Sequence, residues 1–289
     1  MRLINKKAAL ATTVLGFLLM SSFIASCDGQ SSIYAPSWMK EDTYATYTFQ
    51  FSQMQKDGAT YIVSQLMFLN GSYRDFRNAT SATLRWECTR LDEETATLNV
   101  SYTITSDLPI DNFYTSASVN VDIASRSVYL QNGTLIGTTR MWMPSSPADG
   151  AEVVFWDAPP DRATANVTTK NPDGGNIISQ TPSQGAQRCF MLENLAGKIN
   201  GQDASTVNNL FYFEYDTGLF LYGAIQHEPL FKALGIYDTF QAAEFSSSNV
   251  DFGPQSTIIN WSYVLSLAAV AGSIAIIAAV TVWRRLRRK

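Results

Sequence analysis

Residues 95–105 read TATLNVSYTIT, and apolar and polar side chains alternate along them without a break. Successive side chains of a β-strand point to opposite faces of a sheet. This period of two therefore predicts a strand with one face in a core and the other in water. The predicted core face comprises Ala96, Leu98, Val100, Tyr102 and Ile104. The opposite face carries Asn99 between hydroxyl-bearing neighbours.

Segments with the same alternation occur on both sides of this strand, separated by turn sequences. Further strands are expected at residues 43–53, 59–69, 82–91, 116–123, 126–130, 134–143, 153–156, 163–169, 187–192, 208–215 and 219–225. The dipeptides Asp57-Gly58 and Asn132-Gly133 are typical of hairpin turns. One short helix is expected at residues 229–234, before Gly235. The pattern predicts an all-β domain with a curved antiparallel sheet, as a half-barrel or a sandwich.

Residues 258–283 contain no acidic or basic residue and no histidine. A helix rises about 1.5 Å per residue, so residues 263–283 cover roughly 30 Å, the hydrocarbon thickness of a bilayer. Trp261 and Trp283 flank this segment, and such rings prefer the headgroup region. Residues 284–289 are almost entirely basic, which predicts a cytoplasmic end. We therefore expect a single transmembrane helix.

Residues 1–27 have the features of an export signal, with a basic start, an apolar run and a stretch of small residues. The basic residues are Arg2, Lys6 and Lys7, and the apolar run covers residues 8–20. An uncleaved anchor is the alternative if the apolar run extends to Ala25. The tetrapeptide IASC that ends the segment matches a lipobox, which would place a lipid on Cys27.

These signals predict a chain held in the cell membrane by one pass. Its expected parts are a signal at 1–27, an extracytoplasmic β domain at 28–250, a tether at 251–257, a transmembrane helix at 258–283 and a cytoplasmic tail at 284–289. One stripe of the predicted helix carries the small residues Ala268, Gly272, Ala275 and Ala279. Such a stripe permits close contact with a second helix, and an alanine-rich span without a partner is the alternative. Expected partners are membrane lipid around the helix and other surface or membrane proteins.

The charge of the β domain argues against nucleic acid as a partner. All 25 acidic residues lie between the two ends, whereas eight of the 21 basic residues lie in the ends. The body therefore carries a net charge of about −12, against −4 for the whole chain. A strongly acidic exterior repels phosphate backbones, and the simplest interpretation is a solvated surface.

The cysteines and asparagines predict modifications of an exported domain. If Cys27 is removed or acylated, Cys88 and Cys189 form an even pair, which predicts a disulfide. Six asparagines precede x-Ser or x-Thr, and the expected glycosylation sites are Asn70, Asn78, Asn99, Asn132 and Asn166. The sixth, Asn260, lies against the predicted span and is expected to stay unmodified.

Few residues point to catalysis, and no cofactor or metal is expected. His227 is the single histidine, and beside Glu228 at a helix start it is interpreted as structural. A hydrolase would need clustered carboxylates, and its candidates are Asp157, Asp161, Glu214 and Asp216. The last hairpin is rich in aromatic residues that either pack in the core or line an apolar pocket: Phe211, Tyr212, Phe213, Tyr215, Phe220 and Tyr222.

The ensemble of features resembles the single-pass surface proteins common in archaeal genomes. The features are the signal, the sequon-rich β body, Asn132-Gly133-Thr134 leading to Gly137 and Trp142, the YDTGL sequence at 215–219, and the basic tail. This resemblance implies a single membrane pass with the β domain outside the cell. It assigns no active-site residue to this sequence. The YDTGL hairpin also resembles half-barrel lipoproteins that cradle lipid.

Three hypotheses follow for the function. The first is a membrane-anchored surface protein whose β domain is a binding or structural module rather than an enzyme. The second is a half-barrel that binds an apolar ligand or lipid. The third is an extracytoplasmic hydrolase that uses the four carboxylates named above.

Overall fold

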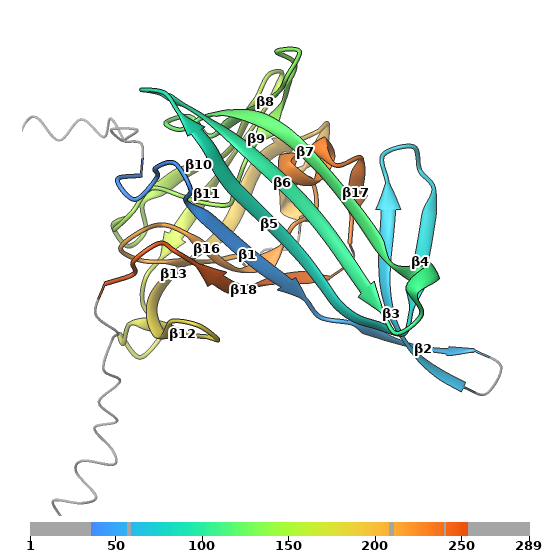
Figure 1. Cartoon of the computed structure of the whole chain (residues 1–289). Helices are drawn as coiled ribbons and strands as arrows, with labels where there is room; N and C mark the ends of the chain where they lie inside the picture. The colour runs from blue at the N-terminus through green and yellow to red at the C-terminus, as the bar shows by residue number, and fades with distance from the viewer. Residues whose placement is uncertain (1–35, 57–58, 208–210, 240, 254–289) are drawn as a thin grey trace, which may run out of the picture. The chain divides into compact units, whose positions relative to one another are not determined.

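The computed structural model describes residues 36–56, 59–207, 211–239 and 241–253 (Figure 1). Contacts divide the chain into Met1–Tyr34 and Ala35–Lys289, and every described residue belongs to the second unit. The predicted signal, Cys27, Asn260, the membrane span and the basic tail lie outside the described residues. Within the described ranges, no helix has the length and apolar character needed to cross a bilayer.

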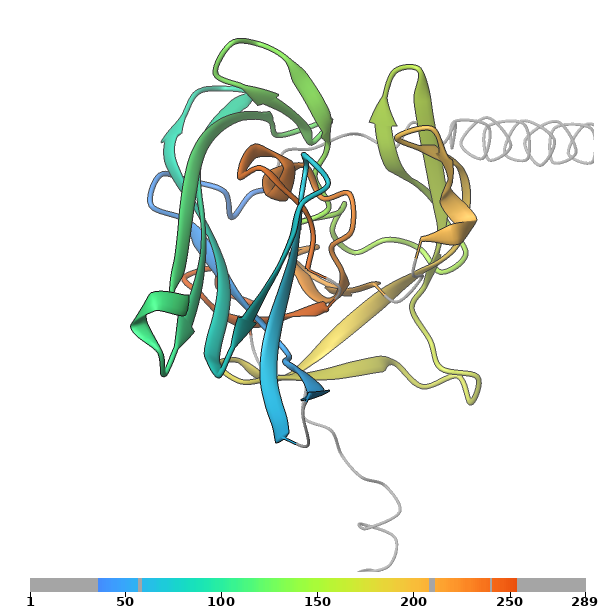
Figure 2. The same cartoon turned by 90° about the vertical axis from the view of Figure 1, so that its right-hand side faces the viewer.

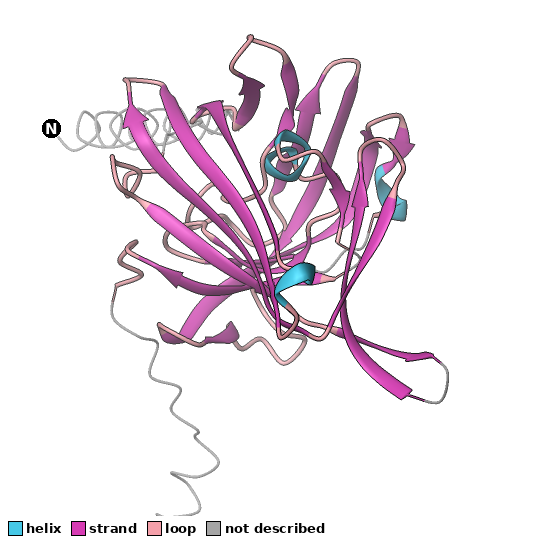
Figure 3. Cartoon of the chain, turned by 45° about the vertical axis from the view of Figure 1, so that its right-hand side comes forward, coloured by secondary structure: helices cyan, strands magenta, loops and turns pink. Residues whose placement is uncertain are grey.

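One large antiparallel sheet dominates the described residues (Figures 1 and 3). Its path runs β10 (Glu152–Ala158), β11 (Asp161–Thr168), β13 (Gly185–Ile199), β15 (Phe211–Glu214), β16 (Phe220–Ala224), β18 (Ala242–Ser248), β1 (Tyr44–Phe49), β5 (Ala79–Leu91), β6 (Thr95–Ser106), β7 (Phe113–Asp122), β8 (Ser127–Leu130) and β9 (Leu135–Thr138). Two further strands, β12 (Ile177–Thr181) and β14 (Gln202–Asp203), pair with β13. The predicted all-β fold with a curved antiparallel sheet is confirmed.

A smaller sheet and three short helices complete the described residues. The smaller sheet contains β2 (Ser52–Lys56), β3 (Ala59–Phe68), β4 (Tyr73–Arg77) and β17 (Ile236–Asp238), with β3 at its centre. The helices are η1 (Pro109–Asp111), η2 (Ala204–Thr206) and α2 (Pro229–Ala233). The large sheet curves around α2 (Figure 2), and Phe231 of α2 packs against Phe49 of β1 and Tyr102 of β6.

The two ends of the sheet path meet through side chains instead of a backbone ladder. On β9, the Thr138 hydroxyl donates a hydrogen bond to the Asp157 carbonyl of β10 at 2.9 Å and accepts one from the Asp157 N–H at 2.8 Å. The Arg126 guanidinium, from the turn before β8, donates to the carbonyls of Thr139 and Val154. The sheet is therefore nearly closed, and two polar side chains bridge its seam.

The strand faces follow the alternation of the sequence. All five predicted core residues of β6 are fully buried, and β1 alternates between half-buried and buried positions in the same way. The concave interior is occupied by packed rings, among them Trp86 and Trp142, whose centroids lie 6.0 Å apart. A hydrophobic face that turns inward on nearly every strand explains why the sheet wraps around one core.

Three strand predictions were wrong, and the first is residues 43–53, which the structure divides into β1 of the large sheet and β2 of the small one. Residues 134–143 were expected as one strand, but β9 ends at Thr138 because Thr139 and Arg140 turn inward to bind Glu228. The segment 242–248 was not predicted as a strand. It forms β18, which pairs with both β16 and β1.

Candidate functional site

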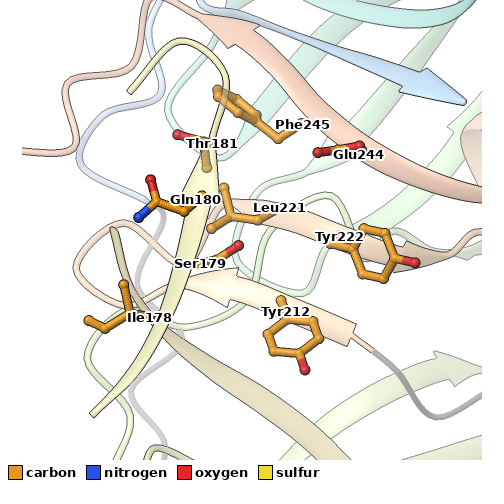
Figure 4. Close-up of a pocket in the computed structure, with 9 residues that line it drawn as sticks. All are labelled: Ile178, Ser179, Gln180, Thr181, Tyr212, Leu221, Tyr222, Glu244 and Phe245. Atoms are coloured by element: carbon orange, nitrogen blue, oxygen red, sulfur yellow. The ribbon is translucent and has the colours of Figure 1, made fainter. Parts of the chain in front are cut away.

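A pocket of about 280 Å³ opens where β12 crosses β15, β16 and β18 (Figure 4). This volume lies just below the range of about 300–1,000 Å³ that is typical of small-molecule sites. The residues that line it are Ile178, Ser179, Gln180, Thr181, Tyr212, Leu221, Tyr222, Glu244 and Phe245. β12 contributes polar side chains to one wall, and the sheet contributes aromatic rings and a carboxylate to the other.

The sheet wall is built from one row of directly paired residues. Tyr212 of β15 pairs with Tyr222 of β16, and Tyr222 pairs with Glu244 of β18. Directly opposite residues in an antiparallel pair project to the same face, so their side chains stand next to one another. The neighbours of these residues along the strands, Phe213 and Ala243, are fully buried. The row therefore lies on the outer face, opposite the core.

The second wall depends on a hairpin between β12 and the first part of β13. Ile177 pairs with Cys189 and Thr181 pairs with Gly185. The Thr181 hydroxyl donates to the Gly185 carbonyl at 3.1 Å and accepts from the Gln184 N–H at 3.2 Å, which closes the turn. The hairpin is thus fixed by its own hydrogen bonds and holds the Ser179 hydroxyl on the side of the tyrosines, whereas the Gln180 side chain points away from them (Figure 4).

The chemistry of the pocket combines aromatic faces with one negative charge. The rings of Tyr212 and Tyr222 have centroids 6.1 Å apart and an interplanar angle of 61°. Glu244 is half-buried, and none of the three ion pairs among the described residues involves it. The other polar lining groups are hydroxyls and one side-chain amide, which are neutral. The pocket can therefore offer π-faces, neutral hydrogen-bonding groups and a carboxylate to a ligand.

A second polar cluster lies in the interior, around Glu228 at the start of α2. Its carboxylate accepts hydrogen bonds from the Thr139 hydroxyl at 2.6 Å and from the Arg140 N–H at 3.0 Å. The Arg140 guanidinium lies beside the same carboxylate and also donates to the Gln226 carbonyl at 2.6 Å. Burial lowers the pKa of Arg140 and lowers that of Arg126 to about 10. These bonds tie α2 to the chain beyond β9.

His227 belongs to this interior cluster. It is 2% exposed, and its Nδ1 lies 3.2 Å from the side-chain nitrogen of Asn200. Burial, together with the positive charges of Arg140 and Lys232, lowers the pKa of His227 to about 4. The imidazole is therefore neutral at pH 7, and its contacts are those of a packed structural side chain.

The four carboxylates proposed for a hydrolase do not meet. Asp157 and Asp161 lie at the β10–β11 turn, near the Gly197 end of β13. Glu214 pairs with Cys189, which lies eight residues before Gly197 on β13. At about 3.3 Å per residue, these two points of the strand are about 26 Å apart. Glu214 is occupied by its own turn, where it accepts from the Thr217 hydroxyl at 2.6 Å. Among the described residues, no group of three His, Cys, Asp or Glu side chains could hold a metal ion.

The structure contradicts the predicted disulfide. Cys88 on β5 and Cys189 on β13 are free, buried, and separated in the sheet by β15, β16, β18 and β1. A disulfide requires Cα atoms within about 7 Å, and neighbouring strands alone are about 4.8 Å apart. Each thiol donates to a nearby carbonyl instead, of Arg90 and Gln187 respectively. Burial raises the pKa of both thiols, and that of Cys189 to about 12.

The predicted glycosylation sites lie at the surface, with one exception. Asn70, Asn99, Asn132 and Asn166 are exposed, whereas Asn78 is half-buried. The expectation that Asn99 lies on the solvent face of its strand is confirmed, and Asn132 and Asn166 are exposed as well. Asn78 adopts a φ of 51° between β4 and β5, where its carbonyl accepts from Asp107 and Ser106.

Sequence reasoning found part of the pocket and missed the rest. Of the six aromatics singled out in the last hairpin, Phe211, Phe213 and Phe220 are core residues and Tyr212 and Tyr222 line the pocket. Glu244 and β12 were missed, because the signal that places them is strand pairing. No protein-family model, no curated protein and no solved structure matches this chain.

Proposed function

We propose that this chain is a membrane-anchored cell-surface protein whose extracytoplasmic β domain binds a small ligand in the pocket beside β12. The observation that supports binding is the convergence of two tyrosine rings, a carboxylate and the polar β12 wall on one cavity. The ligand is placed on the outer face because the concave interior is filled by the packed rings of the core. The domain then acts as a binding module.

The proposed location depends on the sequence at both ends. An uncharged segment at 258–283 followed by a basic tail supports one membrane pass with the tail in the cytoplasm. The basic, apolar and small-residue order of residues 1–27 supports export of the domain. Exposed sequons on several strands and turns are consistent with a domain that meets a glycosylating enzyme. The resemblance to archaeal surface proteins is part of this proposal.

Protease treatment of sealed cells tests the topology. The domain should be digested from outside, while an antibody against residues 284–289 should detect a protected stub. Digestion of the domain only after the cells are opened would overturn the proposed sidedness.

A pocket-filling variant tests the binding role. Ser179→Trp places a large ring in the pocket, and Ser116→Trp makes the same change at an exposed position on β7. Ligand-detected NMR of the full-length protein would use a probe mixture of choline, glucose, N-acetylglucosamine and leucine. At least one probe should bind the natural protein and the Ser116→Trp variant, and Ser179→Trp should abolish that binding. The proposal fails if no probe binds, or if binding persists in Ser179→Trp.

A further inference from the structure

The pocket contains a row formed by the Glu244 carboxylate and the rings of Tyr222 and Tyr212, and the two rings are inclined to each other. We infer that the pocket recognises an alkylammonium group, such as a quaternary or methylated amine. This inference depends on the proposed binding function and specifies the chemical class of the ligand.

The two tyrosine rings form the walls of a corner. Tyr212 and Tyr222 are cross-strand partners, and their rings are inclined at 61° with centroids 6.1 Å apart. An aromatic face attracts a cation within about 6 Å of its centroid, and inclined rings let one cation face both. Phe245, the neighbour of Glu244 on β18, turns its ring to the opposite face, where it packs against Tyr47 in the core. A sugar ring, in contrast, is best matched by a flat ring face on which it can stack.

Glu244 supplies the charge that such a cation needs. It follows Tyr222 in the row, is half-buried, and has no Lys or Arg ion-pair partner among the described residues. The remaining polar lining side chains of β12 are neutral, so Glu244 is the acidic group of the pocket and no basic side chain lines it. A half-buried carboxylate without a cation is stabilised when a ligand brings one, since partial burial strengthens the attraction.

The β12 wall fits the rest of such a ligand. Ser179 lies on the side of the tyrosines (Figure 4), and its hydroxyl both donates and accepts hydrogen bonds. An ammonium head in the aromatic corner would therefore direct an attached alcohol or ester oxygen toward β12. The volume of about 280 Å³ suits a group of this size.

A matched pair of probes isolates the role of charge. Choline and its uncharged isostere 3,3-dimethylbutan-1-ol have the same shape and differ in the central nitrogen. Both would be titrated into the full-length protein in a polyoxyethylene detergent, which carries neither charge nor sugar. Choline should bind at least about tenfold more tightly than the isostere, because only choline gains the cation–π and ionic attraction. Raising the salt concentration should weaken choline binding alone.

Two variants and one control test whether the pocket causes the difference in affinity between choline and its isostere. Glu244→Gln should weaken choline binding about tenfold while leaving the isostere unchanged, and Tyr222→Leu should weaken choline as well. Glu87→Gln is the control, because Glu87 lies on the outer face of β5 and pairs with Arg85 away from the pocket. It should bind choline as the natural protein does. Circular dichroism of each variant would show that the fold is retained.

The outcomes separate this inference from the proposed function. Suppose that glucose or leucine binds, that Ser179→Trp abolishes this binding, and that choline does not bind. The protein is then a binding module, but its ligand is not an alkylammonium group. Equal affinity for choline and the isostere overturns the alkylammonium inference too. Phosphatidylcholine vesicles distinguish the source of the group: binding to choline alone supports a free amine, and binding to vesicles through Glu244 supports a lipid headgroup.

Discussion

Glu228 and Arg140 form an ion pair at 3.4 Å with side chains that are 0% and 3% exposed. Of the three ion pairs among the described residues, this one is buried, while Arg85–Glu87 and Arg90–Asp92 reach solvent. Because the pair joins α2 to the chain that follows β9, it fixes the helix inside the curve of the sheet. Removing one partner would leave the other charge buried and unpaired.

Arg140→Met should therefore lower the free energy of unfolding by about 3–5 kcal/mol. Arg90→Met, which breaks an exposed pair, should cost about 0–1 kcal/mol. Urea denaturation followed by tryptophan fluorescence measures both values. Adding Glu228→Leu to Arg140→Met should recover part of the loss, because the unpaired charge is then gone. Equal effects of the two single variants would contradict a special role for the buried pair.

The stability of the domain should depend on pH through His227. Its pKa is about 4 in the folded protein and about 6.5 when unfolded, so the unfolded chain binds more protons between these values. Stability is thus retained above pH 6.5 and is lost as the pH falls toward 4. The contribution of this histidine is at most about 1.4 kcal/mol per pH unit.

His227→Asn keeps a residue that tolerates the φ of 66° and removes the titration. Thermal unfolding of both proteins at several pH values between 4 and 7 should show a shallower acid dependence for the variant. Identical slopes would contradict a contribution of His227 to the acid response.

Gly218 should not accept a side chain. An added Cβ would lie 1.9 Å from the Met143 carbonyl oxygen, and the residue has a φ of 73°. Gly133 has a similar φ of 81°, but an added Cβ there meets nothing within 4 Å. Gly218→Ala should therefore unfold at clearly lower denaturant concentration than Gly133→Ala, whose cost of about 1–2 kcal/mol reflects backbone strain alone. Similar midpoints for both variants would refute the close approach.

Thr138 should control the seam between β9 and β10. Thr138→Val removes a buried hydroxyl that makes two hydrogen bonds to the backbone of the exposed residue Asp157. A loss of about 1–3 kcal/mol is expected for the two bonds. Hydrogen exchange should accelerate first in β9 and β10. Thr83→Val, a half-buried position on the outer face of β5, is the control and should change little. Faster exchange spread evenly over all strands would contradict local opening at the seam.

The sequence by itself determined which face of each strand is buried and where the hairpins turn. Residues 95–105 alternate strictly, and β6 buries every apolar residue among them. Asn132-Gly133 forms the predicted turn, in which Gly133 has a φ of 81°. These features depend on side-chain period and on backbone preferences within a few residues, so a short window of sequence contains the information.

Only the tertiary structure decided which strands are neighbours. It places β18 beside β1, nearly 200 residues away in sequence, and thereby aligns Tyr212, Tyr222 and Glu244 in one row. It also separates Cys88 from Cys189, which the even cysteine count had paired. Strand pairing is set by the register and packing of the whole sheet, and no local pattern encodes it. The pocket exists because distant segments pair, whereas each strand exists because of its own alternation.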